Sequence, residues 1–348
     1  FFRKLDIGDL VGVVGTLFRT RTGELTVQVE DIRLLVKGLR PLPDKFHGLA
    51  DVETRYRRRY VDLIVNEQSR QTFRRRAQIT ASLRRFLDQR GYLEIESPMM
   101  QVIPGGANAR PFITHHNALD INLFMRVAQE LYIKRCLVGG FERVYEMNRN
   151  FRNEGLSTEH NPEFTMLEYN EAYLDYVDYM DLTEDMLRTV TEEVTGSAVV
   201  EYQGHQIDLG APFRRLSLGE AVRLHHGTLS ESDCKDAAVL RRHLSSTGVE
   251  SSPNSDVGEL LLEVFEQSVE ATLIQPTFIT GHPVSVSPLS RRSESDPDVT
   301  DRFELFIAGR ELANGFSELN DPQDQEERLR RQASEKADGD EEAMFFDQ

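Results

Sequence analysis

Apolar residues near the start of the chain occur in short β-branched runs rather than at helical spacing. Two runs, VGVVGTLF and LTVQVEDIRLL, are separated by the turn-forming sequence RTGE. Runs of this kind, bounded by turn residues, are typical of paired strands. The pattern predicts two or three paired strands over residues 9–37. Pro41 and Pro43 then interrupt it.

Helical spacing follows. Phe73, Ile79, Leu83 and Leu87 recur near a period of 3.6 and predict a helix from about Asn66 to Arg90. Glycine after the last periodic residue is a common helix stop, and Gly91 stands there. The same reasoning predicts further helical segments at 130–139, 175–195, 214–273 (with a polar break at SSTGVESSPNSD) and 321–335.

Two stretches alternate as strands and predict hairpins. RVYEMNRNF and EFTMLEYNEAY flank a polar loop, and DRFELFIAGREL turns at Ala308 and Gly309. Alternate side chains of a strand point to opposite faces of the sheet. One face of the first hairpin therefore carries Glu146, Asn148, Asn150, Arg152 and Glu154 from the first strand, and Phe164, Met166, Glu168 and Asn170 from the second.

This polar face makes poor core material, because buried charges are costly unless they are paired. It suits the floor of a site that binds both anionic and cationic groups. The other interpretation is a solvent-exposed sheet face with incidental ion pairs, and surface charge patterns are common enough to keep it open.

Composition bounds the class of protein. The chain has 348 residues, 39% hydrophobic and 28% charged, with a net charge of −17. It is long enough for one large and one smaller domain. No apolar run has the length of a membrane span and the opening FFRKLDIGD does not resemble a signal peptide, so a cytoplasmic location is expected. Cys136 and Cys234 fit no metal spacing and are expected to be reduced thiols.

The negative charge argues against non-specific binding of nucleic acid over the whole surface. Any such contact must be local. The basic clusters in YRRRY and FRRRA are candidates, although solvated helix faces would look the same.

Particular motifs add a family resemblance. Phe151-Arg152-Asn153-Glu154, followed by His160, Phe164 and Glu168, resembles motif 2 of the class II aminoacyl-tRNA synthetases, and GYLEIESPMM resembles motif 1. The blocks GGFERVYEMNRNFRNEG, ARPFITHHNALD, IQPTFITGHPVSVSPL and GRELANGFSELND are similar to those of the bacterial lysyl-tRNA synthetases. The resemblance covers essentially the whole chain.

The resemblance implies an α+β fold: an antiparallel six-stranded sheet with flanking helices, preceded by a partial OB-type β-barrel, in a homodimer. The implied domains are a partial anticodon-binding barrel at 1–45, a linker at 46–65 and a catalytic domain at 66–348 with a helical insertion near 215–262. Motif 3 and the earlier barrel strands are not found in the 348 residues, so the chain is expected to be an internal portion of the family's architecture.

The implied activity joins L-lysine to ATP and passes the lysyl group to tRNA(Lys). Such chemistry depends on positioning and charge stabilisation and needs no protein nucleophile. By resemblance, Arg152 bridges the lysine carboxylate and the α-phosphate, Glu154 meets the adenine amino group and Phe164 stacks on adenine. The implied ATP-binding set is Arg152, Glu154, His160, Asn161, Phe164, Glu304 and Glu311, of which Glu304 and Glu311 are the implied Mg²⁺ ligands.

Lysine recognition is implied for acidic residues that face its two ammonium groups. Glu130 and Glu168, with the backbone at Gly106, would hold the α-ammonium, and Glu318 would meet the ε-ammonium. A buried carboxylate needs a cation opposite it, which favours a long amine substrate. The implied lysine-binding set is Gly106, Glu130, Arg152, Glu168, Asn170, Asn314, Phe316 and Glu318.

Two positions depart from the family pattern. Asn170 stands where a tyrosine is usual, and Tyr169 could replace it only through a register slip that would flip it to the other face. Gln129 stands where a proline is usual, a change that we expect to be minor at a helix start.

Two other functions stay open at this stage. A synthetase-like enzyme could attach lysine to a protein elongation factor. Relatives of that kind lack the anticodon barrel, so the barrel-like strands near the start of this chain count against it. A non-catalytic binding module could keep the fold, and the missing motif 3 and Asn170 favour it.

Overall fold

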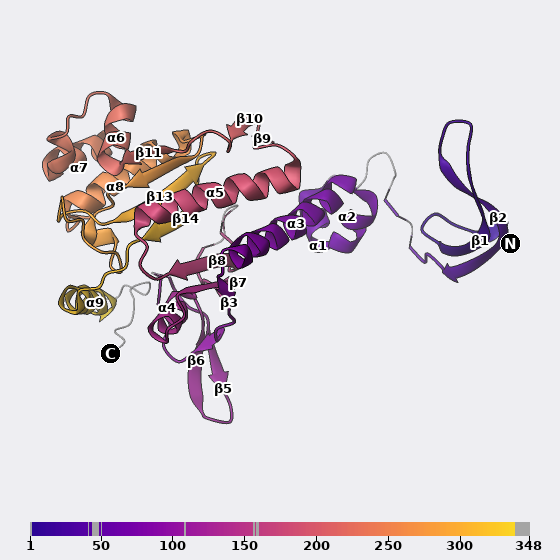
Figure 1. The fold of residues 1–348 in the computed structure, drawn as a ribbon, viewed down its shortest axis with the longest axis horizontal. Coiled ribbons are helices and arrows are strands. Elements are labelled where there is room, and N and C mark those ends of the chain that lie inside the picture. The colour runs from indigo at the N-terminus through magenta and orange to yellow at the C-terminus, as the bar shows by residue number, and fades with distance from the viewer. Residues whose placement is uncertain are drawn as a thin grey trace. The chain divides into compact units, whose positions relative to one another are not determined.

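The computed structural model describes residues 2–40, 42–43, 49, 51–107, 109–155, 157 and 160–337. The chain divides into two compact units, Phe1–Gln78 and Ile79–Gln348. Figure 1 shows the helices and strands of each unit. Among the described residues, none of the helices combines the length and apolar character that a membrane crossing requires.

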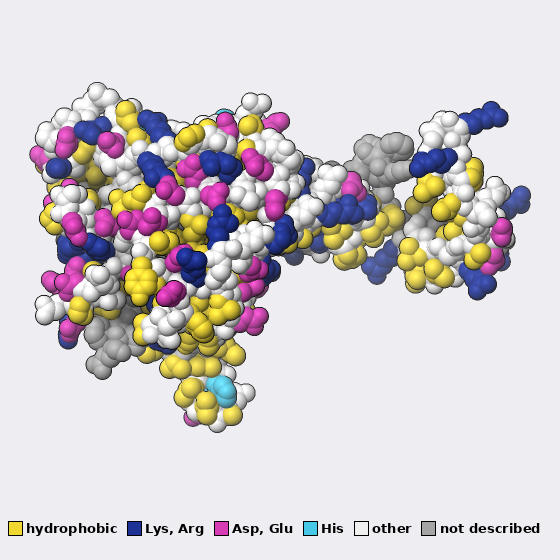
Figure 2. All heavy atoms as spheres, viewed as in Figure 1, with side chains coloured by type: hydrophobic (Ala, Val, Ile, Leu, Met, Phe, Trp, Pro, Cys, Tyr) yellow, Lys and Arg dark blue, Asp and Glu magenta, His cyan; other side chains and the backbone are white. Residues whose placement is uncertain are grey.

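The first unit begins with a short 3₁₀ helix, Phe2–Lys4, and a β-ribbon. Strands β1 (Leu10–Arg19) and β2 (Leu25–Val36) pair antiparallel, which confirms the predicted strands. The ladder is irregular at Gly15, where a Cβ atom would lie 1.9 Å from the carbonyl oxygen of Gln28. Apolar side chains stay exposed along both strands (Figure 2), including Leu10, Val14, Leu17, Leu25, Leu35 and Val36.

Helices follow the ribbon in the first unit: α1 (Val52–Arg57), α2 (Arg59–Val65) and the start of α3 (Glu67–Gln89). The expected linker at 46–65 therefore contains two short helices, while residues 41, 44–48 and 50 lie outside the described residues. The buried carboxylate of Asp62 joins the helices, accepting hydrogen bonds from Arg55 Nε at 2.9 Å and Arg59 Nη1 at 2.6 Å.

Two sheets organise the second unit. The first has the order β11-β12-β13-β14, with β11 parallel to β12 and the other neighbours antiparallel. Its strands are β11 (Arg214–Ser217), β12 (Thr277–Thr280), β13 (Arg302–Ile307) and β14 (Arg310–Phe316). The second has the order β3-β7-β8, with strands β3 (Leu93–Glu94), β7 (Arg143–Phe151) and β8 (Glu163–Glu171).

Two smaller sheets complete the strands of this unit. One has the order β4-β6-β5 and contains β4 (Met100–Gln101), β5 (Ile113–His116) and β6 (Ile121–Met125). The other pairs β9 (Val199–Tyr202) with β10 (His205–Asp208). The sequence pattern did not predict these short hairpins.

The helices of this unit carry strong local signals at their ends. The Asp175 side chain caps α5 in a capping box with Asp178, and Gly196 ends the helix in the left-handed conformation at φ 79°. Ser217 with Glu220, and Asp256 with Glu259, cap α6 and α8 in the same way. The helices are α4 (Glu130–Val138), α5 (Tyr176–Thr195), α6 (Leu218–His226), α7 (Ala237–Ser246), α8 (Val257–Ser268) and α9 (Pro322–Ala337), with 3₁₀ turns at Asp233–Lys235, Glu270–Thr272 and Val284–Val286.

Alternating strand residues divide the core into layers (Figure 1). Met180 of α5 packs with Phe278, Phe303 and Leu305 on one face of the β11–β14 sheet. Helices α6, α7 and α8 pack on the other, in a cluster that includes Ile279 and Phe306 and also buries Cys234. A third cluster packs Phe86 and Leu87 of α3 and Met186 and Val190 of α5 against Tyr145 of β7. The opposite face of β7 is left for polar groups.

The expected helices at 66–90, 130–139, 175–195 and 321–335 and both hairpins are confirmed. The segment 214–273 is largely helical, but it begins with β11 because four residues there pair with β12. The mixed α/β content agrees with the expected fold class. A single six-stranded antiparallel sheet is not confirmed among the described residues, which form separate small sheets, two of them with a parallel pair. Cys136 and Cys234 are free thiols, as predicted.

Candidate functional site

The β7–β8 hairpin forms the floor of the candidate site. In its register Glu146 lies opposite Glu168, Asn148 opposite Met166 and Asn150 opposite Phe164. Directly opposed residues of an antiparallel pair share a face, so the predicted polar face is confirmed for the residues within the two strands, whereas Arg152 and Glu154 lie beyond the end of β7. Glu146 and Asn150 are buried, which makes a solvent-exposed sheet face the wrong interpretation for this part of it.

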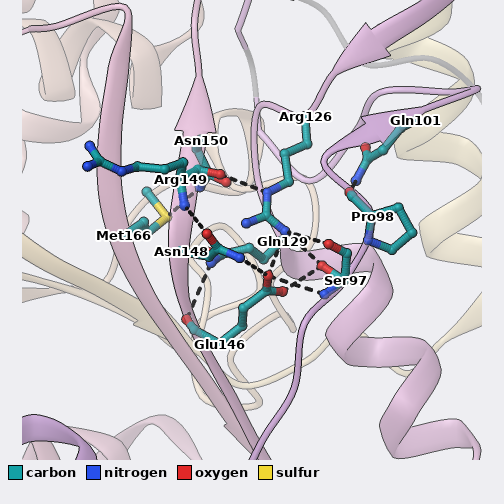
Figure 3. Close-up of polar contacts among 10 residues, drawn as sticks. All are labelled: Ser97, Pro98, Gln101, Arg126, Gln129, Glu146, Asn148, Arg149, Asn150 and Met166. Carbon is teal, nitrogen blue, oxygen red and sulfur yellow. Dashed lines mark hydrogen bonds and ion pairs between the residues drawn. The ribbon is translucent and has the colours of Figure 1, made fainter.

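A buried ion pair lies on this face (Figure 3). Arg126 donates from Nη1 to Glu146 Oε1 at 2.8 Å, and both side chains are almost completely buried. The same carboxylate accepts hydrogen bonds from Ser97 Oγ at 2.5 Å, Ser97 N at 3.2 Å and Asn148 Nδ2 at 3.2 Å. Arg126 also donates to the carbonyl oxygens of Arg149 and Ser97. The network holds the site's floor against the segments that precede α4.

Gln129, at the helix start where a proline is usual in the family, belongs to this network. Its side chain is fully buried, donates from Nε2 to the Glu146 carbonyl oxygen at 3.3 Å, and gives α4 no side-chain cap. Within the described residues, Gln129 Oε1, Asn150 Oδ1 and Arg126 Nη2 are buried without a hydrogen-bond partner. No local sequence signal marks Arg126 and Gln129, because their partners are distant along the chain.

Arg152 follows β7 and lies beside Phe164. Its guanidinium carbon is 5.3 Å from the centre of the Phe164 ring, and its Nε donates to the Val127 carbonyl oxygen at 3.4 Å. Burial lowers the pKa of Arg152, against the opposing influence of Glu154 and Glu311. Among the described residues no carboxylate lies within ion-pair distance of Arg152, so its forked donors keep capacity for an anion.

Three predicted ATP-binding residues lie in the loop after β7. Glu154, His160 and Asn161 are exposed. Ser157 holds the loop by a 2.8 Å hydrogen bond between its Oγ and His160 Nδ1, and it accepts from the His160 backbone N–H at 3.0 Å.

Acidic residues from three elements converge beside the floor. They are Glu130 of α4, Glu168 of β8 and Glu318 after β14. Burial raises the pKa of Glu168 well above its usual range, and the nearby charges of Glu130 and Glu318 raise it further. Burial likewise raises the pKa of Glu318, although Lys134 opposes the shift. Gly106 lies against this cluster at φ +89°, where an added Cβ would be 3.0 Å from Glu130 Cβ.

Lys134 lies among these acidic residues, and no sequence pattern had indicated it. Its ammonium pairs with Glu130, lies 2.9 Å from Glu318 Oε2, and stands 5.4 Å from the centre of the Phe316 ring. The i,i+4 spacing of Glu130 and Lys134 could have suggested a helix pair. It could not have indicated Glu318 or Phe316, which are remote in sequence.

The β13–β14 hairpin carries a second acidic pair, Glu304 and Glu311, of which Glu311 lies near Arg152. The register places Glu304 opposite Asn314 and Phe306 opposite Glu311, with an irregularity between the two pairs. Arg302 pairs with Glu304 and donates to Asn314 Oδ1 at 2.9 Å. Removal of the carboxylate from solvent, and then the charge of Glu304, raise the pKa of Glu311 to about 7, while Arg302 and Arg152 oppose the shift.

Asn170 and Tyr169 settle the register question. Asn170 lies opposite Val144, whereas Tyr169 points to the other face, where it stacks with Tyr179 and hydrogen-bonds Thr183 at 2.7 Å. Tyr169 therefore does not replace a tyrosine in the site. A pocket of about 90 Å³, lined by residues of α7, of the segment that follows α7 and of α8, touches none of the predicted site residues.

The two carboxylates predicted to hold a cation, Glu304 and Glu311, do not form a closed cage, and Glu304 pairs with Arg302. In the described part of the chain, no three His, Cys, Asp or Glu side chains gather in an arrangement that could hold a metal ion. Mg²⁺ at phosphate sites is usually held by one or two carboxylates together with substrate oxygens and water. The crowding that raises the pKa of Glu311 fits a position where a cation would relieve repulsion from Glu304.

The sequence that builds this hairpin floor, the arginine beside an aromatic ring and the converging acids matches a family of known proteins. The chain belongs to the class II tRNA synthetases, because residues 51–347 match the family described as tRNA synthetases class II (D, K and N).

Its relatives narrow the comparison. The lysine–tRNA ligase of Thioalkalivibrio sulfidiphilus is 59% identical over 346 residues, which is 99% of this chain and 69% of the relative. The lysine–tRNA ligases of Aeromonas hydrophila (56% identical, 99% of this chain and 69% of the relative) and Xanthomonas campestris (58%, 99% and 68%) are similar to the same extent.

Proposed function

We propose that this chain carries the amino-acid activation site of a lysine–tRNA ligase. In the first step a lysine carboxylate oxygen attacks the α-phosphorus of ATP, and the bond to pyrophosphate breaks. In the second step a ribose hydroxyl of tRNA(Lys) attacks the acyl carbon, and AMP leaves. The observation that carries this proposal is Arg152, a largely buried guanidinium without an ion-paired carboxylate among the described residues.

Arg152 is suited to hold two anionic oxygens at once. The planar fork of a guanidinium binds carboxylate and phosphate oxygens with directed, charge-assisted hydrogen bonds. The buried surroundings that lower the pKa of Arg152 also strengthen its interaction with an arriving anion. Arg152 would therefore align the two reactants and stabilise negative charge at the α-phosphate during attack.

The acids beside the floor supply the complementary selection for lysine. Burial and the neighbouring carboxylates raise the pKa of Glu168, so an ammonium group brought near it restores favourable pairing. Glu130, Glu168 and the backbone at Gly106 would receive the α-ammonium, and Glu318 the ε-ammonium, with Phe316 along the stem. Asn170 and Asn314 would add hydrogen bonds. A neutral side chain would leave the acids unpaired, which disfavours it.

The remaining polar residues are assigned to ATP. Phe164 offers a ring for adenine, Glu154 an acceptor for its amino group, and His160 and Asn161 polar groups for the outer phosphates. Glu304 and Glu311 would hold Mg²⁺ together with phosphate oxygens. When bound, Mg²⁺ would neutralise phosphate charge as pyrophosphate departs.

The finer architecture is also part of the proposal. The β1–β2 ribbon would belong to an OB-type anticodon-binding barrel at 1–45, since its exposed apolar side chains need a covering layer. Residues 46–65 would connect it to a catalytic domain at 66–348, built on a six-stranded antiparallel sheet with a helical insertion near 215–262. A homodimer would cover exposed apolar residues near motif 1, such as Leu93 and Met100.

Lysine-dependent exchange of labelled pyrophosphate into ATP tests this function. We expect exchange in the wild-type chain and a loss of about 100-fold or more in Arg152→Gln, because one preorganised charge at the reacting centre contributes roughly that much. Arg149→Gln is the matched control, since Arg149 is half exposed and faces Glu163 at 3.6 Å. Exchange that does not depend on lysine would contradict the substrate assignment.

The acceptor requires a second assay. Transfer of labelled lysine to tRNA(Lys), and not to an elongation-factor protein, is the expected result. The relatives named lysine–tRNA ligase support the tRNA acceptor. A chain that neither exchanges pyrophosphate nor binds lysine would instead be a binding module that keeps the fold.

A further inference from the structure

Lys134 places a primary ammonium where the proposed function requires the ammonium of a substrate. The side chain leaves α4 one turn after Glu130, pairs with that residue, and reaches Glu318 Oε2 at 2.9 Å. Its ammonium faces the Phe316 ring at 5.4 Å. Glu318 and Phe316 are the residues assigned to the ε-ammonium and stem of lysine, so one internal lysine already makes the contacts proposed for the substrate.

We infer that Lys134 is an internal occupant of the substrate-ammonium subsite, and that lysine binds by displacing its ammonium from Glu318. This inference rests on the proposed function of the same site. It makes Lys134 a specificity-determining residue, because only a ligand that brings its own ammonium can replace the charge that leaves.

The geometry allows such a displacement. Lys134 has a flexible four-carbon stem. Its side chain is 21% exposed, and the side chain of Glu318 is 42% exposed. The contact is therefore partly buried and partly open to solvent, which reaches it and weakens the ion pair. Glu130 lies on the same helix at i,i+4, so Lys134 can keep a partner after it leaves Glu318.

The ammonium of Lys134 also balances part of the negative charge in this cluster. Glu130, Glu168 and Glu318 form a crowded acidic group, and buried carboxylates without a cation take up protons. Lys134 opposes this tendency at Glu168 and Glu318. Lys134 therefore offsets part of the repulsion among these acids until a ligand supplies its own ammonium.

Isothermal titration of L-lysine into the full chain tests the inference. We expect Lys134→Met, which keeps the stem but has no ammonium, to bind lysine about three- to tenfold more tightly, since the competing contact is lost. Lys134→Arg should bind lysine more weakly, because a guanidinium holds Glu318 through more hydrogen bonds. Arg135→Met is the control for general loss of positive charge, as Arg135 is exposed on the next position of α4.

The outcomes separate the possibilities. Weaker or unchanged binding in Lys134→Met, together with unchanged binding in Lys134→Arg, would make Lys134 a structural counter-charge and overturn the inference while leaving the proposed function intact. Equal tightening in Lys134→Met and Arg135→Met would also overturn it. If the wild-type chain does not bind lysine, the proposed function fails as well. If Lys134→Met does not fold, the direction of the change in Lys134→Arg decides.

Discussion

Removal of the charge on Glu146 should destabilise the second unit far more than removal of an exposed charge on the same hairpin. Glu146 and Arg126 are buried to within 1% of full burial and lie 2.8 Å apart. Glu146→Gln keeps the shape of the side chain. It leaves the Arg126 guanidinium buried without a counter-charge and turns an amide N–H₂ toward Ser97 and Asn148, which are donors to the native carboxylate.

The size of this effect follows from the burial. Breaking a buried ion pair by removing one partner costs about 3–5 kcal/mol. For a domain of this size each kcal/mol lowers the melting temperature by about 2–4 °C, so a loss of about 6–20 °C is expected. Glu163→Gln removes a carboxylate that is 55% exposed and lies 3.6 Å from Arg149. Exposed pairs contribute about 0–1 kcal/mol, so that control should lose less than about 4 °C.

Thermal unfolding followed by circular dichroism at pH 7 measures both variants. A third variant, Arg126→Met combined with Glu146→Leu, should recover part of the loss, because apolar residues of similar volume can replace a buried pair without leaving an isolated charge. The reasoning is refuted if Glu146→Gln melts within about 2 °C of Glu163→Gln, since burial would then not decide the cost.

Three further predictions concern the site and the last helix. Gly106→Ala should weaken lysine binding about 5- to 30-fold, because a left-handed alanine costs about 1–2 kcal/mol and its Cβ would press on Glu130; Gly140→Ala, at φ +100° with no atom near its Cβ, should leave the calorimetric affinity unchanged. Phe164→Ala should raise KM for ATP about 5- to 150-fold in the exchange assay, because about 1–3 kcal/mol of base stacking is lost, while the lysine affinity stays the same. An unchanged KM would show that adenine does not stack on Phe164. Arg328 holds the pKa of Asp324 at about 2, below its ordinary 3.8, so the pair stabilises the fold above pH 4 and is lost as the pH falls toward 2. The urea midpoint of Asp324→Asn should therefore lie below that of the wild type at pH 7 and approach it near pH 2, and a pH-independent difference would contradict the assignment.

Local patterns in the sequence were sufficient for most elements that carry the candidate site. The alternation in RVYEMNRNF and EFTMLEYNEAY predicted the β7–β8 hairpin and the face shared by Glu146 and Glu168, because side-chain direction in a strand depends only on position parity. Strand β12 was not predicted. Three of its four residues are buried between neighbouring strands, and so short a segment has no distinctive period.

Only some residues of the candidate site, and few of their contacts, could be predicted from the sequence. Motif resemblance indicated Arg152, Glu168, Glu304 and Glu318, and the structure brings Arg152 near Glu311 and Glu168 near Glu318. The prediction that Gln129 is a minor change at a helix start stays a prediction, and the structure adds that its side chain is buried in a network with Glu146. The chain distance between such partners hides the contact from any local pattern.

The sequence by itself determined the longer helices and the two predicted hairpins, which residues of those strands share a face, and which family the motifs resemble. Each of these depends on neighbours within a few positions along the chain. Only the tertiary structure decided that Arg126 neutralises Glu146, that Gln129 is buried, and that the ammonium of Lys134 pairs with the acids beside Glu168. Burial and charge pairing depend on which distant segments pack together, so the charge state of the site is a property of the folded chain.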